Sequence, residues 1–353
     1  MTDNHPSRAR LDSIARLRAT MSEDELGVAD RIAHMQAQHC VMARDDQLAK
    51  HIADMKRSLI SATSDNDKER RILFIVGESD SGKSECLGHV LSRSRLAPYS
   101  DEFGEARPLL WFKMPTPCTL RNIAVECLRN LGFPVRGDIT ESRVWPILRE
   151  QLKQRRVLFL VLDEAQRTMK SDNDYEIQKV SDTLITLVEM EDWPMRMILT
   201  GVPDLEQLRK RDNQMRNRSR IMRFEPVPEE LAGRVEEWLK EIVVQHAGLG
   251  LGDLPTHEYA ERLIRSCEGN VGSIILMVRS AATFAILDGR QAIRASDFAR
   301  AYHHRTACTP EANLFEVANW TELEGGKAKI GKEESGKPPA IPANKVKPGE
   351  RPR

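Results

Sequence analysis

Hydrophobic positions change their spacing along the chain and divide it into an alternating part and purely helical parts. Between residues 71 and 224, five short apolar runs are separated by segments whose apolar residues recur every three or four positions. The short runs predict buried strands and the longer segments predict amphipathic helices. Strands that are apolar throughout and alternate with helices predict a parallel sheet covered on both faces. The predicted strands span 71–76, 108–113, 156–162, 195–199 and 221–224, and the predicted helices 83–94, 120–131, 144–154, 177–189 and 205–211.

The segments on either side carry only helical spacing. Ser22 and Glu25 stand in capping-box spacing ahead of a first helix, and a second helix is predicted over 45–61. Further helices are predicted over 229–246, 257–267, 273–287 and 295–303, and the chain then becomes rich in Lys, Gly, Glu and Pro. We therefore predict a disordered N-terminus (1–21), N-terminal helices (22–63), an α/β nucleotide-binding domain (64–226), a small all-helical lid domain (227–310) and a mostly disordered tail (311–353).

Composition excludes little. The 353 residues are 40% hydrophobic, and 53 basic side chains balance 53 acidic ones, so net charge indicates no partner, although a balanced total can hide a local basic patch. The six cysteines show no metal-ligand spacing and are interpreted as reduced structural thiols. Neither a signal peptide nor a run of about 18 apolar residues is visible. We expect a cytoplasmic protein with no membrane partner.

A phosphate-binding loop follows the first predicted strand. Residues 77–84 match G-x-x-x-x-G-K-[ST] between an apolar strand and a helix, which is the context that this motif requires. Its backbone N–H groups and the helix N-terminus favour phosphate, and Lys83 is expected to reach the β- and γ-phosphates while Ser84 binds Mg²⁺. The alternative is a chance Gly/Ser-rich turn. The expected ATP-binding residues are Gly77, Glu78, Ser79, Asp80, Ser81, Gly82, Lys83, Ser84 and Glu85.

Two acids end the third apolar strand. Asp163 at such a strand tip can bind Mg²⁺, and Glu164 can act as the general base that polarises the attacking water. A strand followed by an acidic turn is the alternative, and the P-loop upstream argues against it. Because Glu164 directly follows Asp163, we favour ATP hydrolysis over mere binding. Thr200, which follows the fourth strand, would touch the γ-phosphate or the lytic water, or would simply cap the next turn.

Arginines recur before the last strand. In a ring or filament, Arg218, or next Arg216, would reach the nucleotide of the neighbouring subunit as an arginine finger. A solvated basic face is the alternative.

Together these residues resemble the AAA+ ATPases of the initiator-like branch, and more narrowly the TniB/TnsC family of transposition regulators. The resemblance covers about residues 25–310. The matching features are the paired N-terminal helices, the P-loop, Asp163-Glu164-Ala165-Gln166, Leu199-Thr200-Gly201-Val202-Pro203-Asp204-Leu205, Gln214-Met215-Arg216-Asn217-Arg218 and Leu131-Gly132-Phe133-Pro134.

The resemblance implies a P-loop AAA+ ATPase that assembles as a homo-oligomeric ring or helical filament on double-stranded DNA. Such proteins use ATP and Mg²⁺ and link target-site selection to a DDE transposase and a TniQ-like protein, with a CRISPR effector in CRISPR-associated transposons. Hydrolysis would control disassembly. In one departure, residues 268–273 lack the arginine that opens many AAA+ lids, and the next arginine is Arg279. We therefore expect no lid-borne nucleotide sensor and a larger role for the neighbouring subunit.

The candidate DNA contacts lie between the second strand and its helix, a region that faces DNA in the initiator-like branch. Lys113, Thr116, Thr119 and Arg121 offer two cations and two hydroxyls near a helix N-terminus, which suits phosphate oxygens. An ordinary helix start capped by Thr119 is the alternative. The basic cluster at 153–156 is interpreted as a solvated helix end.

Two functions of other classes remain open. A P-loop kinase would need an acceptor pocket and a lid behind the P-loop, and the long helical segment after the fifth strand argues against it. A non-hydrolysing nucleotide switch or scaffold is disfavoured by Glu164.

Overall fold

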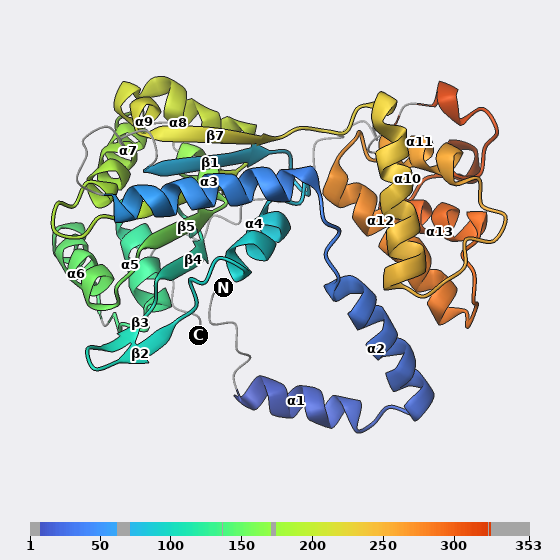
Figure 1. The fold of residues 1–353 in the computed structure, drawn as a ribbon, viewed down its shortest axis with the longest axis horizontal. Helices are drawn as coiled ribbons and strands as arrows, with labels where there is room; N and C mark the ends of the chain where they lie inside the picture. The colour runs from blue at the N-terminus through green and yellow to red at the C-terminus, as the bar shows by residue number, and fades with distance from the viewer. Residues whose placement is uncertain (1–7, 62–70, 136, 171–173, 324, 326–353) are drawn as a thin grey trace, which may run out of the picture.

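The computed structural model describes residues 8–61, 71–135, 137–170, 174–323 and 325. These residues form two lobes side by side, an α/β domain and a helical domain, with α1 and α2 as an arm along the lower edge of the view (Figure 1). Within these ranges, no helix combines the length and the apolar character needed to cross a bilayer.

The α/β domain is built on a five-stranded sheet in the order β4-β5-β6-β1-β7, and all neighbouring strands are parallel. This confirms the predicted sheet. Every residue of β1 and of β6 is buried, as expected for central strands covered on both faces. The strands are β1 (Ile72–Gly77), β4 (Leu109–Lys113), β5 (Phe159–Asp163), β6 (Arg196–Gly201) and β7 (Ser219–Phe224).

Alternate residues of each strand enter different cores. Phe74 and Val76 pack in one core with α5, α6 and α7, whereas Leu73 and Ile75 pack in the other with α3 and α4. The sheet is therefore a middle layer between two layers of helices (Figure 1). The helices of this domain are α3 (Ala43–Ile60), α4 (Lys83–Ser92), α5 (Leu120–Asn130), α6 (Glu141–Gln154), α7 (Asp174–Val188), α8 (Glu206–Arg211) and α9 (Asn213–Asn217), with 3-10 turns η2 (Ala165–Lys170) and η3 (Pro203–Leu205).

A short hairpin that the sequence pattern does not predict precedes β4. It consists of β2 (Tyr99–Asp101) and β3 (Gly104–Ala106), paired antiparallel. Arg156 holds it to the domain by donating two hydrogen bonds to the Asp101 carboxylate and by lying over the Tyr99 ring.

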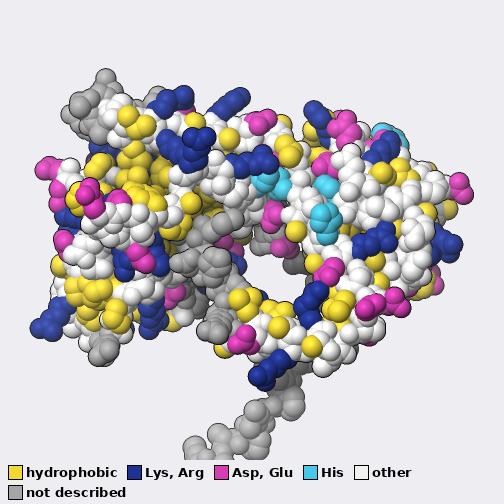
Figure 2. Space-filling view, turned by 60° about the horizontal axis from the view of Figure 1, so that its bottom comes forward, with side chains coloured by type: hydrophobic (Ala, Val, Ile, Leu, Met, Phe, Trp, Pro, Cys, Tyr) yellow, Lys and Arg dark blue, Asp and Glu magenta, His cyan; other side chains and the backbone are white. Residues whose placement is uncertain are grey.

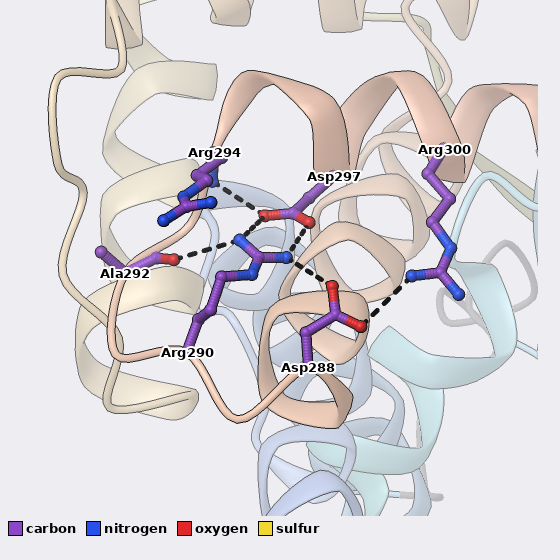
Figure 3. Close-up of polar contacts among 6 residues, drawn as sticks. All are labelled: Asp288, Arg290, Ala292, Arg294, Asp297 and Arg300. Atoms are coloured by element: carbon purple, nitrogen blue, oxygen red, sulfur yellow. Dashed lines mark hydrogen bonds and ion pairs between the residues drawn. The ribbon is translucent and has the colours of Figure 1, made fainter.

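The helical domain follows β7 and contains its own core around Phe298 and Tyr302. A network of charged groups closes the turn between its last two helices, where Arg290 bridges Asp288 and Asp297 (Figure 3). One predicted helix is divided into three parts, the last of which is a π-helix. The elements are η4 (Glu229–Leu231), α10 (Ala232–Lys240), the π-helix η5 (Glu241–His246), α11 (Thr256–Ser266), α12 (Val271–Leu287), α13 (Ala295–Thr306), η6 (Pro310–Ala312) and η7 (Trp320–Glu322).

The two N-terminal helices do not form one unit. In α2 (Glu23–Ala37), which begins at the predicted Ser22–Glu25 capping box, Met35 is buried in the core of the helical domain. In α3, Leu48 packs instead on the α/β domain. The segment between them, residues 38–42, which we call the linker, therefore passes from one domain to the other.

Both predicted disordered ends are partly ordered. Residues Arg8–Arg18 form helix α1, so the prediction of a disordered N-terminus is wrong for this stretch. Leu314 and Phe315 are buried in the helical core, so the helical domain extends beyond its predicted end at residue 310. Both ends were misread because single apolar residues among polar ones give weak periodicity. The predictions for 1–7 and 326–353 lie outside the described residues.

Candidate functional site

A cavity of about 470 Å³ lies where the two domains meet. The P-loop, the end of β5, the linker and α12 all contribute to its wall. The space-filling view shows an opening between the two lobes, with histidine and acidic side chains along its upper edge (Figure 2).

The P-loop joins β1 to α4 and has the backbone that phosphate binding requires. Gly82 has φ +83° and Asp80 has φ +60°, both in the left-handed region, so the loop folds back over the start of α4. Gly82 is the N-cap of α4 and carries no side chain that could cap the helix. The first N–H groups of α4 are therefore directed at the cavity, where an anion can accept from them.

Lys83 is placed on the first turn of α4 and folds over the loop. Its Nζ donates to the Gly77 and Glu78 carbonyls at 2.8 and 2.7 Å and to Ser81 Oγ at 3.1 Å. All three partners are neutral. Burial lowers the pKa of Lys83, and the carboxylates of Glu164 and Asp163 partly oppose this effect. The ammonium thus lacks a direct anionic partner in the described residues, and a phosphate chain would supply one.

Asp163 ends β5 opposite α4 and is 4% exposed. Ser84 Oγ donates to its Oδ2 at 3.1 Å, the Glu164 N–H donates to its Oδ1 at 2.9 Å, and Thr200 Oγ1 donates to the same Oδ1. The structure therefore brings together Ser84, Asp163 and Thr200, which the sequence places far apart.

This cluster fits Mg²⁺. Mg²⁺ prefers oxygen ligands, and a buried carboxylate next to a hydroxyl on the P-loop helix provides two. Within the described ranges, the Asp163 carboxylate accepts hydrogen bonds only from neutral donors, so no cation contacts it directly. Ser84 and Asp163 would hold the metal.

Glu164 has a left-handed backbone, with φ +59°, which is uncommon for a residue with a side chain. Gln166 Nε2 donates to its carboxylate at 2.7 Å, while Gln166 Oε1 accepts from the Val202 N–H at the end of β6. Gln166 thus bridges two strand ends and holds the Glu164 carboxylate at the wall of the cavity. Our sequence reasoning missed this positioning role, although Gln166 is part of the Asp163–Gln166 motif.

The helical domain touches the P-loop directly. Asn270, the N-cap of α12, donates from Nδ2 to the Ser79 carbonyl at 2.7 Å. A Cβ on Gly272 would lie 2.0 Å from the Asp80 carbonyl oxygen, so only glycine allows this approach.

The helical domain also brings a cation to the cavity. Gly272, Ile275, Leu276 and Arg279 lie on one face of α12 and line the wall. This corrects the expectation that the lid has no arginine at the nucleotide site, because two helical turns return Arg279 to the face that Gly272 occupies. Arg279 also donates to the Gln38 carbonyl of the linker.

Residues around the start of α3 contact the P-loop and line the cavity beside it. Arg44 donates to the Ser81 carbonyl at 2.9 Å and lies over the Phe224 ring. Beside it, His39 hydrogen-bonds the buried Asp45 carboxylate at 3.0 Å. Burial opposes protonation of His39, but its hydrogen bond to Asp45 and the nearby Glu85 carboxylate outweigh this effect and raise its pKa to about 9. No sequence motif marks these residues, since only packing brings α3 to the loop.

The two candidate arginine fingers differ. Arg218 is mostly buried and pairs with Glu189 of its own chain. Arg216, on α9, is exposed, and no partner for its side chain occurs in the described part of the chain. Arg218, the preferred arginine finger, is therefore held in an ion pair within its own chain, whereas Arg216 remains accessible.

The candidate DNA contacts do not gather into one surface. Lys113 lines the nucleotide cavity. Thr119 caps α5 by accepting from the Asn122 N–H at 3.2 Å, and Arg121 is held by Asp138 and the Ile139 carbonyl. Thr116 is exposed between them.

The basic cluster at the end of α6 is engaged within the chain. Each of its three cations pairs with an acid of the same chain, and their side chains are only 19–30% exposed. The pairs are Lys153–Asp192, Arg155–Glu105 and Arg156–Asp101.

Solved structures of other proteins are similar to this chain, among them the following two. Cdc6p from Pyrobaculum aerophilum superposes with a TM-score of 0.55 at 15% identity, covering 78% of this chain and 71% of that one. The ORC1 protein of Aeropyrum pernix, solved in complex with DNA, gives a TM-score of 0.52 at 14% identity, covering 77% and 69%. At this identity the likeness shows the fold alone, and it agrees with the predicted AAA+ arrangement of a five-stranded parallel sheet followed by helices. No curated protein matches the chain.

A family model described as Bacterial TniB protein matches residues 31–228. The match begins in α2 and includes the P-loop and every strand of the five-stranded sheet. It extends over more than half of the chain, and the protein therefore belongs to the TniB family.

Proposed function

We propose that this chain is an Mg²⁺-dependent ATPase that assembles on duplex DNA, couples target-site choice to a DDE transposase, and uses hydrolysis to end the assembly. The observation that carries the proposal is that the charged groups at the cavity have no direct ionic partner among the described residues. Lys83 bonds only neutral acceptors and Asp163 accepts only from neutral donors within the described chain, with Glu164 at the same wall.

The residues divide the chemistry between them. The P-loop amides and Lys83 bind the phosphates, and Glu164, held by Gln166, accepts a proton from the attacking water. Ser84 and Asp163 hold Mg²⁺, which when bound neutralises charge on the phosphate oxygens. Thr200 hydrogen-bonds Asp163 and orients its carboxylate. Arg279 and Lys113 add cations at the rim of the cavity.

Assembly would complete the site. Arg216 is exposed on α9 and is the arginine that a neighbouring subunit could receive at its γ-phosphate. Arg218 is the weaker candidate, because a contact in trans would first have to break its pair with Glu189.

Membership of the TniB family supports a role in transposition, and with it partners such as a transposase and a TniQ-like protein or CRISPR effector. The candidate DNA contacts are Lys113 and Thr116, which are exposed, and Thr119 and Arg121, whose hydrogen bonds within the chain a phosphate would have to share or replace.

The test is ATP turnover and assembly of Glu164→Gln. Amide replacement removes the proton acceptor but keeps shape, so we expect ATP binding to persist and turnover to fall at least about 100-fold. Phosphate release with and without duplex DNA, and electron microscopy of the DNA-bound protein, measure the two effects. The polymer on DNA should persist at saturating ATP. Glu191→Gln, an exposed acid outside the cavity, is the matched control and should behave as the parent.

Three outcomes would overturn the proposal. An assembly of Glu164→Gln that dissolves at saturating ATP contradicts the timing role of hydrolysis. If the parent protein binds nucleotide but does not hydrolyse it, the chain is a nucleotide switch and not an ATPase. Phosphoryl transfer to a metabolite would make it a kinase.

A further inference from the structure

Three metal-ligating side chains that are remote in sequence meet at the junction of the linker and the helical domain. Cys40 of the linker and Glu241 and His246 of η5 each bring one ligand atom within 4.8 Å of the other two. His246 Nε2 lies 3.4 Å from Glu241 Oε1. The Cys40 residue is 2% exposed, and the side chains of His246 and Glu241 are 9% and 28% exposed, so solvent reaches the group only from the Glu241 side.

The backbone of η5 is what brings two of these residues together. In an α-helix, residues five apart point about 140° away from each other around the axis. The π-helix instead bonds each N–H to the carbonyl five residues back, as Ala247 does to Ile242 at 2.9 Å, and this returns His246 to the face of Glu241. Single π-turns are rare in proteins overall, and those that occur are often found at functional sites.

One polar atom of the group lacks a hydrogen bond. His246 Nδ1 is buried and has no partner among the residues that the structure describes. A buried ring nitrogen without a partner is unusual for a histidine that serves only in packing. With its Nε2 facing Glu241, the ring is not fixed by hydrogen bonds on both sides.

We propose that Cys40, Glu241 and His246 form a Zn²⁺ site that joins the linker to the helical domain. Thiolate, imidazole and carboxylate are the three side-chain ligands of Zn²⁺, and bond lengths of about 2.0–2.3 Å place such ligand atoms about 3.3–3.8 Å apart. A local closure of about 1 Å therefore forms a three-ligand site with one position left for water. Mixed S, N and O ligands favour Zn²⁺ over Mg²⁺ or Ca²⁺.

The bound metal would join two parts of the chain that hydrogen bonds already hold together. Arg279 of α12 donates to the linker carbonyl of Gln38, and Arg31 of α2 donates to the Ala247 carbonyl just after η5. Because Cys40 also lines the nucleotide cavity, the metal would fix one part of its wall. The site itself does not depend on the proposed ATPase function.

The test is Co²⁺ and Zn²⁺ titration of the full-length, metal-stripped protein. We expect one ion per chain and, with Co²⁺, a near-ultraviolet thiolate-to-metal absorption band, followed by displacement with Zn²⁺. Cys40→Ser should lose the band, and His246→Gln should bind at least about 10-fold more weakly. Cys267→Ser, which removes another buried thiol of the helical domain, should keep the absorption band and the affinity of the parent protein.

Thermal unfolding keeps the test meaningful if a variant folds poorly. Zn²⁺ should raise the Tm of the parent and of Cys267→Ser, and should leave that of Cys40→Ser unchanged. Parent protein that binds less than about one tenth of an equivalent, or that binds Co²⁺ without the thiolate band, would overturn the site. So would equal affinity in Cys40→Ser.

Discussion

Two buried aspartates, one in each domain, have opposite surroundings. Asp297 at the start of α13 is 2% exposed, and Arg290 donates two hydrogen bonds to its carboxylate (Figure 3). Asp163 at the end of β5 is 4% exposed, yet its carboxylate accepts only from two hydroxyls and a backbone N–H. The structure satisfies the first with its own cation and leaves the second with neutral donors.

The same contrast holds for the cations. Hydrogen bonds to Asp297 raise the pKa of Arg290, against some opposition from burial. Burial lowers the pKa of Lys83, whose hydrogen-bond partners are carbonyls and a hydroxyl. A buried charge that is kept without an opposite charge costs free energy, so such an arrangement persists where a ligand supplies the missing partner. In these two clusters, the comparison distinguishes a carboxylate paired with a cation of its own chain from one that a ligand or metal can still approach.

The largest effect should come from Lys83→Ala. Removal of the ammonium should weaken Mg-ATP binding at least about 100-fold, because a charge-assisted bond to phosphate is lost, while folding stability should hardly change. Isothermal titration calorimetry and urea unfolding measure the two. Lys210→Ala removes an exposed cation of α8 and serves as control. Substantial unfolding of Lys83→Ala would place this lysine with the Arg290–Asp297 cluster.

Asp297→Ala should have the opposite effect: it should lower folding stability and leave nucleotide binding nearly unchanged. It leaves Arg290 without its main partner and removes the acceptor for the Arg294 N–H, and we expect a loss of about 3 kcal/mol in the free energy of unfolding. Affinity for Mg-ATP should stay within about twofold of the parent. Urea unfolding and calorimetry on the same preparation decide this. A selective loss of nucleotide binding in a stable variant would contradict the distinction.

The smallest expected effect concerns Glu236 and the dependence of folding stability on pH. Hydrogen bonds from Lys240, Thr256 and His257 lower its pKa to about 2. A depressed carboxyl pKa contributes stability above the unfolded value of 4.5, and this contribution is lost as pH falls towards 2. Glu236→Gln should cost about 1 kcal/mol at pH 7 and clearly less at pH 3, as urea midpoints would show. Glu237→Gln, on the exposed neighbour, should show little effect at either pH.

The sequence predicts the sheet well because its central strands are apolar at every position, as in β1 and β6. The sequence pattern fails to predict elements whose side chains are only partly buried. The hairpin β2–β3 is mostly exposed and polar, so it shows no alternation, and α1 leaves its apolar side chains Leu11, Ile14 and Leu17 exposed. The break of the long helix at η5 is also invisible, since a π-turn has no clear periodicity of its own.

The site divides in the same way. The P-loop and the acids at 163–164 are contiguous and carry a local signal. Gln166, Arg44 and Arg279 reach the cavity from three other elements, and their roles follow from packing rather than from spacing along the chain. The misjudged case is Arg279, which is distant in sequence from the expected position and yet lies on the right face of α12.

The chain crosses between the domains twice. It leaves the helical domain through the linker after α2 and returns to it after β7, where the Val227 N–H donates to the Gly269 carbonyl. The α/β domain is thus an insertion within the helical domain, fastened at two points. Two covalent fastenings leave rotation about the line between them as the least hindered relative movement. Opening of the nucleotide cavity should then be a rotation of one domain about a single hinge axis. Cutting the chain at either crossing would leave one covalent connection, and the domains could then rotate about more than one axis.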